Sequence, residues 1–436
     1  MGLYIAFGTF MATMLVSVIS GFSMIPALLV GLVAFLIVGK SRGFSLKNMA
    51  QMSKKGIKDS TIVILVMLVI GMVTAVWRVS GTITVFVYYG MKFIMQPVFL
   101  MVTFLLCCLL SYAIGTSFGV AGTVGVVFMA LARSGGVDPI ITAGVIMSGI
   151  YFGDRCSPVS SSANMVAGVT GTKIYDNVKI MFKTGMLPLV VALIAYGVLS
   201  ITNPISHVDQ EMVSAFENEF SISAWAFVPA IIMIALPLLK VGVIQAMAGS
   251  IVSGLLVACL VQNIPLLEVL KVCIFGYKST SDGIGAILNG GGLISMVEIA
   301  VILVISSTYS GIFTGTGMLL ALQDKLSKAC TKMGRFAVMV MMSIVTAAIF
   351  CNQTIGTLMC ADLLRQPYLD GGGTQEELAI DMENSVRLIA CMIPWCIGCS
   401  VPLALLGVDF AAILFAVYMY AVPICYLFTK KKWFDN

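Results

Sequence analysis

Long apolar segments recur along almost the whole chain, and this feature most restricts how the chain can fold. Residues 22–39, 60–77 and 97–114 contain no charged side chain, and residues 178–201 contain only two. A helix of about 20 apolar residues spans the hydrocarbon core of a bilayer. Charged residues make up 10% of the chain, far below the roughly 25% typical of soluble domains. We therefore predict an all-α, polytopic membrane protein.

The length and the distribution of positive charge predict how the chain crosses the membrane. A chain of 436 residues has room for roughly 10 to 14 spanning helices with short connections. Lys and Arg concentrate on the cytoplasmic side of membrane proteins. They are frequent between residues 40 and 58 and again at Lys430–Lys432. We expect a multi-pass protein of the cell inner membrane with cytoplasmic N- and C-termini, and we interpret the net charge of +5 as topology rather than nucleic-acid binding.

Polar interruptions break the apolar pattern at matching places in the two halves of the chain. In the first half, small and polar residues crowd residues 115–125 and 153–164. In the second half, Asn352–Thr354 and Pro394-Trp395 interrupt apolar runs. Interrupted membrane segments at corresponding positions of two halves are typical of transporters that bind their substrate between repeats. We therefore expect two inverted repeats with broken helices and re-entrant segments.

These interruptions, with a polar segment near the middle of the chain, define four regions. Residues 1–59 are expected to form a helical hairpin and a cytoplasmic connector, and residues 60–202 the first transport repeat. Residues 203–222 carry several acids and no Lys or Arg, which predicts an external loop. Residues 223–436 are expected to form the second transport repeat.

Asp154 has the most informative chemistry in the first half. A carboxylate inside a membrane protein is costly and marks a functional site by default. It can hold a proton or a cation but not both, which is the minimal basis of cation/proton exchange. Sodium prefers oxygen ligands. Candidate ligands follow Asp154 at Ser157, Ser160, Ser161, Ser162 and Asn164. The alternative is that Asp154 only pairs with Arg155, or lies at a helix end in water.

The second half offers Glu383 as a further binding carboxylate. The alternative is an ion pair between Glu383 and Arg387 on a solvated helix. Neutral oxygen donors lie between apolar runs in both halves, where they either bind an ion or form hydrogen bonds between helices. These donors are Thr116, Ser117, Asn352, Gln353 and Thr354.

Arg155 has two candidate roles beside the predicted site. It is either the counter-ion of Asp154 when no cation is bound, or the group that holds the carboxylate of an organic substrate. The second role follows because the planar guanidinium matches the geometry of a carboxylate.

Several other classes of function are not expected. The chain has one histidine, His207 in a polar loop, and it has no Walker motif. Most of its 12 cysteines lie in apolar runs, where a free Cys behaves as a small buried hydrophobic residue. We therefore expect no enzyme, no cofactor and no metal site other than sodium at Asp154.

A series of short motifs lies between Trp77 and Asn164. They are Ser80-Gly81-Thr82, Tyr88-Tyr89-Gly90, Gly115-Thr116-Ser117, Gly122-Thr123-Val124-Gly125, and Tyr151-Phe152-Gly153-Asp154-Arg155 with Ser157-Pro158 and Ser160. The second half adds Gln353, Glu383 and Ile393-Pro394-Trp395. With these motifs the sequence resembles the NhaC family of sodium/proton antiporters, most strongly between Trp77 and Asn164 and more loosely over residues 60–425.

The resemblance implies a secondary active transporter with alternating access, most specifically a sodium/proton antiporter with Asp154 and the following serines at the ion site. The alternative is a sodium- or proton-coupled transporter or exchanger of a small organic acid or amino acid, since the family includes organic-acid exchangers. Ser161 and Asn352 stand where the family carries acids, which leaves the coupling stoichiometry open. The expected partners are sodium ions, protons and the lipid bilayer, with an organic solute and a homodimer left open.

Overall fold

The computed structural model of the protein describes residues 2–93, 96–205, 210–239, 241–279, 284–285, 288–317 and 323–434. Within these ranges every regular element is a helix, and the only β-bridge joins Tyr277 to Gly290. The predicted all-α, polytopic membrane fold is confirmed.

The helices vary widely in length, and several begin with side-chain caps that the sequence supplies. Ser45 accepts a hydrogen bond from Asn48 N at the start of α3, and Asp138 caps α8 with Pro139 in the first turn. The helices up to the polar middle segment are α1 (Gly2–Ser20), α2 (Ile25–Ser41), α3 (Leu46–Val79), α4 (Thr82–Phe93), α5 (Phe99–Ile114), α6 (Ser117–Val120), α7 (Val126–Ser134), α8 (Pro139–Cys156), α9 (Ser161–Thr170) and α10 (Ile174–Thr202). From there on they are α11 (Gln210–Glu219), α12 (Val228–Leu238), α13 (Val243–Leu260), α14 (Leu266–Phe275), α16 (Val297–Thr316), α17 (Gln323–Met333), α18 (Arg335–Phe350), α19 (Gln353–Asp370), α20 (Gln375–Glu383), α21 (Val386–Ile389), α22 (Ile397–Leu406), α23 (Val417–Thr429) and α24 (Lys431–Phe434). Short 3-10 helices lie at Gln96–Val98, Ala224–Phe227, Ile294–Met296, Ala390–Met392 and Phe410–Phe415.

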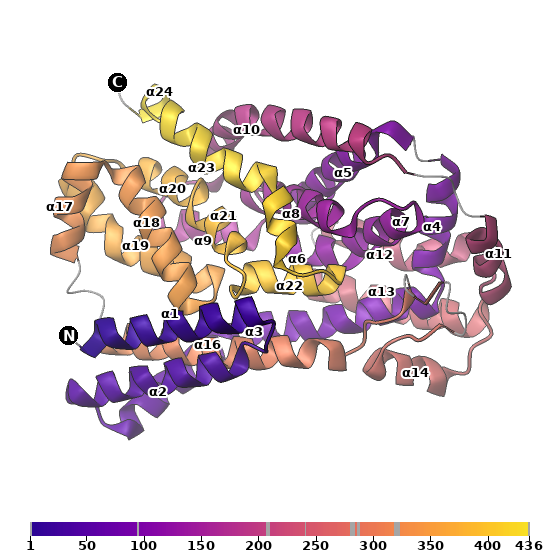
Figure 1. The fold of residues 1–436 in the computed structure, drawn as a ribbon, viewed down its shortest axis with the longest axis horizontal. Coiled ribbons are helices and arrows are strands. Elements are labelled where there is room, and N and C mark those ends of the chain that lie inside the picture. The colour runs from indigo at the N-terminus through magenta and orange to yellow at the C-terminus, as the bar shows by residue number, and fades with distance from the viewer. Residues whose placement is uncertain are drawn as a thin grey trace.

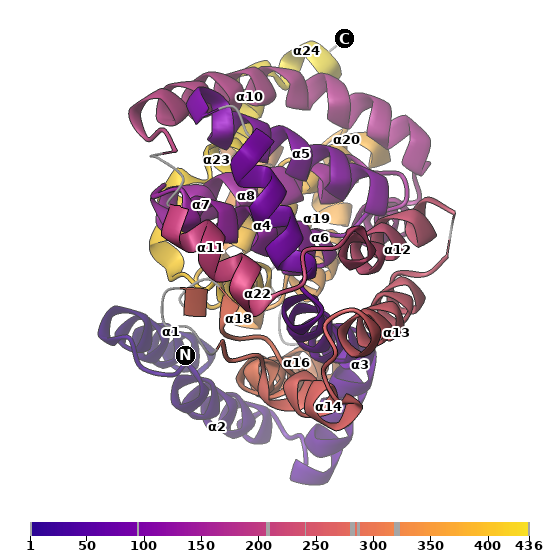
Figure 2. The same cartoon turned by 90° about the vertical axis from the view of Figure 1, so that its right-hand side faces the viewer.

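The helices form two groups that lie against each other (Figure 1). We call the first group the flanking layer; it consists of α1, α2, α3, α13, α14 and α16, with α3 packed along α16. Figure 2 shows this layer below the remaining helices, which we call the core group. In the core group α5 packs along α8, α10 along α23 and α18 along α19. Both groups combine helices from the two halves of the chain.

Several helices match the length and polarity of membrane spans. Among the residues that the structure describes, five helical segments are long and apolar enough to span a membrane, and they cover residues 60–79, 117–134, 174–202, 243–260 and 294–313. A further pair, Gln375–Met392 and Ile397–Leu406, passes the same test together and is bent by 53°. Shorter apolar helices of 10–17 residues, such as Phe99–Ile114 and Arg335–Phe350, lie among them. The bent pair is the kind of broken span that the sequence predicts in the second half.

The first break in each half has the same backbone geometry. α5 ends at Gly115 in the left-handed region (φ 74°), and the extended Thr116 caps α6. In the second half α18 ends at Cys351 in the left-handed region (φ 54°), and the extended Asn352 caps α19. The agreement supports the predicted repeat, whereas the inverted relation of the halves stays a prediction.

The unwound segment around Gly115 is shorter than the sequence predicts. Only Gly115 and Thr116 leave the helix, because Ala121–Gly125 forms a π-helical turn that continues into α7. Gly115 is required at this point, since a Cβ atom there would lie 2.8 Å from the carbonyl carbon of Val159. The glycine-rich segment therefore allows close packing rather than a long loop.

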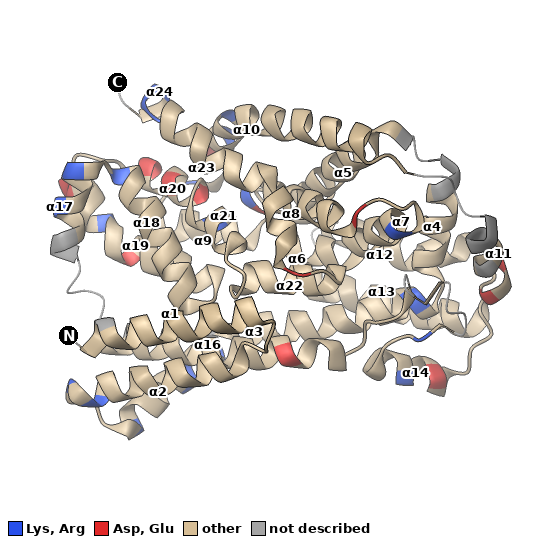
Figure 3. Cartoon of the chain, viewed as in Figure 1, with Lys and Arg blue, Asp and Glu red and all other residues tan. Residues whose placement is uncertain are grey.

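The two ends of the molecule differ in charge. Both termini lie at one end (Figure 1), and Lys and Arg are frequent there (Figure 3). The predicted connector is not a separate element, because its residues from Leu46 onward are the first turns of α3. In the predicted external loop, α11 occupies Gln210–Glu219, while His207 lies outside the described residues. The four predicted regional boundaries stay predictions.

Candidate functional site

A cavity of about 470 Å³ lies where the broken helices of both halves begin; we call it the central cavity. In the described part of the chain, the first residues of five helices line it. They are Thr116-Ser117 at α6, Ser161-Ser162 at α9, Gly242–Gln245 at α13, Asn352–Thr354 at α19 and Ile397-Gly398 at α22. A helix N-terminus carries unpaired N–H groups and a partial positive charge. The cavity is therefore surrounded by positive helix ends.

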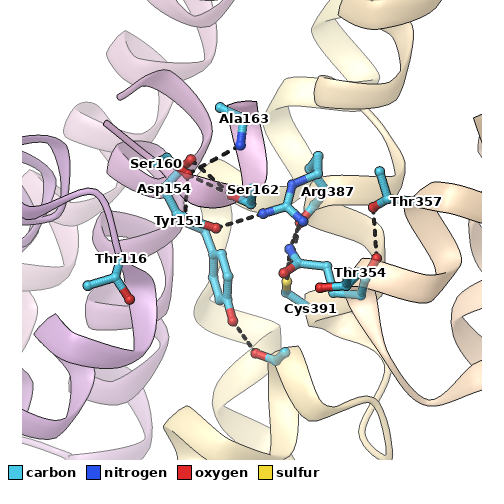
Figure 4. A network of polar contacts seen from close by, with 12 residues as sticks. Thr116, Tyr151, Asp154, Ser160, Ser162, Ala163, Thr354, Thr357, Arg387 and Cys391 are labelled. Atoms are coloured by element: carbon cyan, nitrogen blue, oxygen red, sulfur yellow. Dashed lines mark hydrogen bonds and ion pairs between the residues drawn. The ribbon is translucent and has the colours of Figure 1, made fainter. Parts of the chain in front are cut away.

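Asp154 is the carboxylate on the wall of this cavity, and its partner is Arg387 (Figure 4). The Arg387 Nη2 atom lies 2.8 Å from Asp154 Oδ2, and the two side chains are only 1% and 8% exposed. The hydroxyl of Ser160 donates to Asp154 Oδ1 at 3.0 Å. One carboxylate oxygen is thus held by a cation and the other by a hydroxyl, and the ion pair joins α8 of the first half to α21 of the second.

The serines that follow Asp154 divide into two groups. Ser160, Ser161 and Ser162 face the ion pair or the cavity: the Ser160 and Ser162 hydroxyls are 2.7 Å apart, and Ser161 and Ser162 line the cavity. Ser157 instead donates its hydroxyl to the carbonyl of Tyr112 at 2.6 Å.

Asn164, also predicted as a ligand, does not line the cavity. Its Nδ2 donates to the carbonyls of Pro158 and Ser160, at 2.8 Å each. Together with the Ser157 bond, this contact holds the chain between α8 and α9 in place. Ser157 and Asn164 therefore shape the break.

The polar residues at the start of α19 reach the same cavity. Gln353 donates from Nε2 to the carbonyl of Arg387 at 2.5 Å and so positions the helix that carries the arginine. Asn352 caps α19 by accepting from Thr354 N at 2.9 Å. All three line the cavity, as do Thr116 and Ser117 from the first half. The structure thus brings the neutral oxygen donors of both halves to one place.

Arg155 does not face the cavity and does not pair with Asp154, which corrects the sequence prediction. Its guanidinium donates to Tyr418 Oη at 3.0 Å, to Thr184 Oγ1 at 3.0 Å and to Asn384 Oδ1. The reason is geometric, because consecutive residues on a helix point about 100° apart. The counter-ion of Asp154 is Arg387, which lies 233 residues further along the chain. The sequence did contain a sign of this role, because Arg387 lies inside an apolar run, where a charged residue marks a functional site.

Glu383 is fully buried beside this pair but does not line the cavity. Both of its carboxyl oxygens lack a hydrogen-bond partner among the described residues. The charges of Arg387, Arg155 and Asp154 all act on it. The predicted alternative of a solvated helix is wrong here, since Glu383 is 0% and Arg387 2% exposed.

Comparison with known proteins identifies the family. Residues 149–430, more than half of the chain, match the sequence model of a family described as the Na+/H+ antiporter family. The chain belongs to this family. The matched part of the antiporter includes Asp154, Arg387 and the breaks after α8, α18 and α21. The chain is accordingly a secondary antiporter and a multi-pass membrane protein.

Curated relatives match the antiporter over most of its length. The "Na(+)/H(+) antiporter NhaC" of Alkalihalophilus pseudofirmus is 26% identical over 84% of this chain and 81% of the relative. The "Malate-2H(+)/Na(+)-lactate antiporter" of Bacillus subtilis is 24% identical over 85% of this chain and 80% of the relative. The "Arginine/ornithine antiporter ArcD" of Halobacterium salinarum is 25% identical over 81% and 76%, respectively. These relatives are antiporters by name and confirm the predicted resemblance to the NhaC family.

A second cavity of about 430 Å³ adjoins the central cavity of the antiporter. Val63, Asn352 and Thr354 line both. The second cavity continues to Lys55 near the beginning of α3 and to Asp362 on α19. The two cavities together lead from Asp154 toward the N-terminal end of α3, where the basic residues of the predicted connector lie.

Proposed function

We propose that the protein exchanges sodium ions for protons and that Asp154 is the side chain at which the two compete. The observation that carries this proposal is the buried Asp154–Arg387 ion pair on the wall of the central cavity. A buried carboxylate is stable only when its charge is compensated. Arg387 supplies that compensation in this structure. A sodium ion or a proton that binds Asp154 compensates the same negative charge in place of Arg387.

Sodium is a hard cation that prefers oxygen ligands, and the cavity wall offers several beside Asp154. The Ser160 hydroxyl already contacts the carboxylate at 3.0 Å. The other oxygen donors that line the cavity are Thr116, Ser117, Ser161, Ser162, Asn352, Gln353 and Thr354. Glu383 is a second proton acceptor behind the pair, because its oxygens have no hydrogen-bond donor among the described residues.

The ion pair also explains how occupancy would control movement. Asp154 belongs to the first half and Arg387 to the second, so their bond holds the halves together when the site is empty. Loading Asp154 with a sodium ion or a proton releases Arg387 and breaks this connection. Only the loaded protein would then change between its two orientations, which is the requirement for coupled exchange.

The test is Asp154→Asn in sodium-loaded vesicles with an internal pH probe. We expect sodium-driven proton flux to fall at least about a hundredfold, because the amide cannot bind a proton and holds a cation far more weakly. Asp176→Asn is the matched control, since Asp176 pairs with Lys179 at the surface and is 59% exposed. Undiminished flux in Asp154→Asn, with normal flux in the control, would contradict the assignment.

A second candidate function is the transport of a small organic carboxylate through the same cavity. The helix N-termini that line it favour an anion there, and Arg387 keeps Nε and Nη1 without a partner among the described residues. A volume of about 470 Å³ also exceeds what a sodium ion needs. The candidate predicts that a carboxylate and sodium raise each other's affinity, because sodium at Asp154 frees Arg387. Independent binding would exclude it.

We further propose the cell inner membrane as the location, with both termini in the cytoplasm. The proposal rests on the basic residues at the end of the molecule that carries both termini. A homodimer stays a prediction.

A further inference from the structure

We propose that the protein has a second anion-binding site, a cavity between Arg78 and Arg133 that takes a small organic carboxylate. This arginine cavity has a volume of about 250 Å³ and is separate from the central cavity. It lies where α3 and α7 end, against the last turn of α22 and the loop before α16. Its polar lining includes Thr74, Arg78, Arg133, Asn289 and Ser295.

Arg78 is the more deeply buried of the two arginines. It lies in the last turn of α3, it is 7% exposed, and its Nη1 donates to the carbonyl of Thr74 at 2.8 Å. Its Nε has no partner among the described residues. The loop at Gly291 packs directly against α3, where a Cβ atom would lie 2.7 Å from Ala75 N. Gly290 and Gly291 thus line the cavity together with Arg78.

Arg133 approaches the same cavity from α7. Its Nη2 donates to the carbonyls of Leu406 and Gly407 at 3.0 and 3.1 Å, at the C-terminal end of α22. These bonds fix the guanidinium at the cavity wall. Neither arginine forms an ion pair in the part of the chain that the structure describes.

The charges in the cavity favour a bound anion. Two guanidinium groups repel each other in a partly buried space, and no Asp or Glu is among the described residues that line it. A buried charge that lacks a partner is costly, and an anion between the two arginines removes this cost for both. Guanidinium matches carboxylate in a planar, two-bond geometry.

The rest of the lining selects the class of anion. Val126, Met129, Met296 and Leu405 add an apolar surface to the lining of the cavity. An inorganic anion gains nothing from such a wall, whereas the carbon chain of a short organic acid buries apolar surface against it. The two arginines suit a compound with two carboxylates. We therefore assign a short-chain dicarboxylate to the cavity.

The arginine cavity and the central cavity lie in different parts of the molecule and share no lining residue among those described. Arg78 lies at the opposite end of the 34-residue helix α3 from the basic connector. With the proposed orientation, this end faces the outside of the membrane. The inference does not depend on sodium/proton exchange at Asp154, so either can fail alone.

The test uses thermal unfolding of the purified full-length protein in detergent, with sodium succinate compared with sodium chloride at the same sodium concentration. Succinate should raise the melting temperature in a saturable manner, because a ligand that binds only the folded state stabilises it. Arg78→Gln and Arg133→Gln should each weaken the apparent affinity at least about tenfold, the usual effect of losing one charged hydrogen bond. Arg365→Gln, an exposed arginine on α19, is the matched control.

Each other outcome has a defined meaning. Loss of the succinate effect in Arg387→Gln but not in Arg78→Gln or Arg133→Gln would place the ligand in the central cavity and overturn the proposal. Stabilisation by sodium phosphate but not by succinate would overturn the carboxylate class. A shift that needs added anionic lipid would assign the cavity to a headgroup and overturn it as well. If Arg78→Gln does not fold, the half-buried Arg133→Gln alone decides.

Discussion

The described part of the core group contains two buried clusters with ion pairs, and they differ in how completely their polar atoms are paired. The first is the central pair of Asp154 and Arg387 on the wall of the central cavity. The second, which we call the C-terminal network, lies where α18 and α20 begin and α19 and α23 end. It consists of Arg335, Glu377, Asp381 and Lys430, with the hydroxyls of Tyr368 and Tyr426.

In the C-terminal network the carboxylates are fully occupied. Tyr368 and Tyr426 donate to Asp381 at 2.7 and 2.9 Å, and the ammonium group of Lys430 also contacts it. Arg335 binds Glu377 through two bonds of 2.9 Å each, and Lys430 lies 2.6 Å from the same carboxylate. Two positive and two negative charges cancel, and four helices are tied together.

The central pair is incomplete by comparison. Around it, Arg387 Nε and Nη1, both oxygens of Glu383 and Asn384 Nδ2 have no hydrogen-bond partner among the described residues. Saturated networks stabilise one arrangement, whereas unpaired polar atoms beside a cavity leave capacity for a ligand. The difference assigns a structural role to the C-terminal network and a binding role to the central pair.

The largest expected effect is on stability, in the C-terminal network. Lys430→Met should lower the free energy of unfolding by about 3–5 kcal/mol, because it leaves two carboxylates with one cation inside the protein. Denaturant titration in mixed micelles measures this loss. Lys431→Met is the matched control and should change stability by less than about 0.5 kcal/mol, since Lys431 is exposed. Equal stability of the two variants would remove the structural role of the network.

An intermediate effect is expected at the central pair. Arg387→Gln should lower the free energy of unfolding by about 1–3 kcal/mol in sodium-free buffer, because Asp154 keeps Ser160 but loses its cation. Sodium should restore up to about 2.7 kcal/mol at a concentration a hundred times its dissociation constant. The same titration should stabilise Lys430→Met less, because Arg387 there still competes with sodium for Asp154. A sodium effect in Lys430→Met as large as that in Arg387→Gln, or no effect in Arg387→Gln, would reverse the roles of the two clusters.

The smallest expected effect is at Ser160. Its hydroxyl donates to Asp154 and also accepts from Ala163 N as the cap of α9. Ser160→Ala should cost about 1 kcal/mol of stability through the lost cap. It should also weaken sodium affinity severalfold, measured by the sodium dependence of melting. Ser157→Ala should weaken that affinity less, because Ser157 bonds to Tyr112 rather than to Asp154. Equal sodium affinities in both variants would remove Ser160 from the sodium site.

Much of the fold could be predicted because membrane insertion acts on local composition. The apolar runs gave the all-α, polytopic class, and the polar interruptions located the breaks beside Gly115 and Asn352. The break at Gly115 proved shorter than expected, because Ala121–Gly125 continues the helix as a π-helical turn. The residues of the predicted connector from Leu46 onward belong to α3, which Ser45 caps.

The candidate site was predicted in part. Asp154 and the polar residues at the helix starts share the central cavity, as the motifs indicate, but Ser157 and Asn164 turn toward backbone carbonyls. Arg155 was chosen because it is next to Asp154 in sequence. Arg387 and the arginine cavity could not be found in this way, because their partners come from distant segments.

The sequence by itself determined that the chain crosses a membrane, where its helices break and which carboxylate lies at the break after α8. These properties follow from the free-energy cost of placing polar groups in lipid, and this cost depends on the local sequence of each segment. Only the tertiary structure decided that Arg387 rather than Arg155 neutralises Asp154, that Lys430 completes a closed network and that Arg78 and Arg133 line one cavity. Such pairings depend on how helices from both halves are packed, and packing brings together residues whose separation along the chain carries no information about their distance.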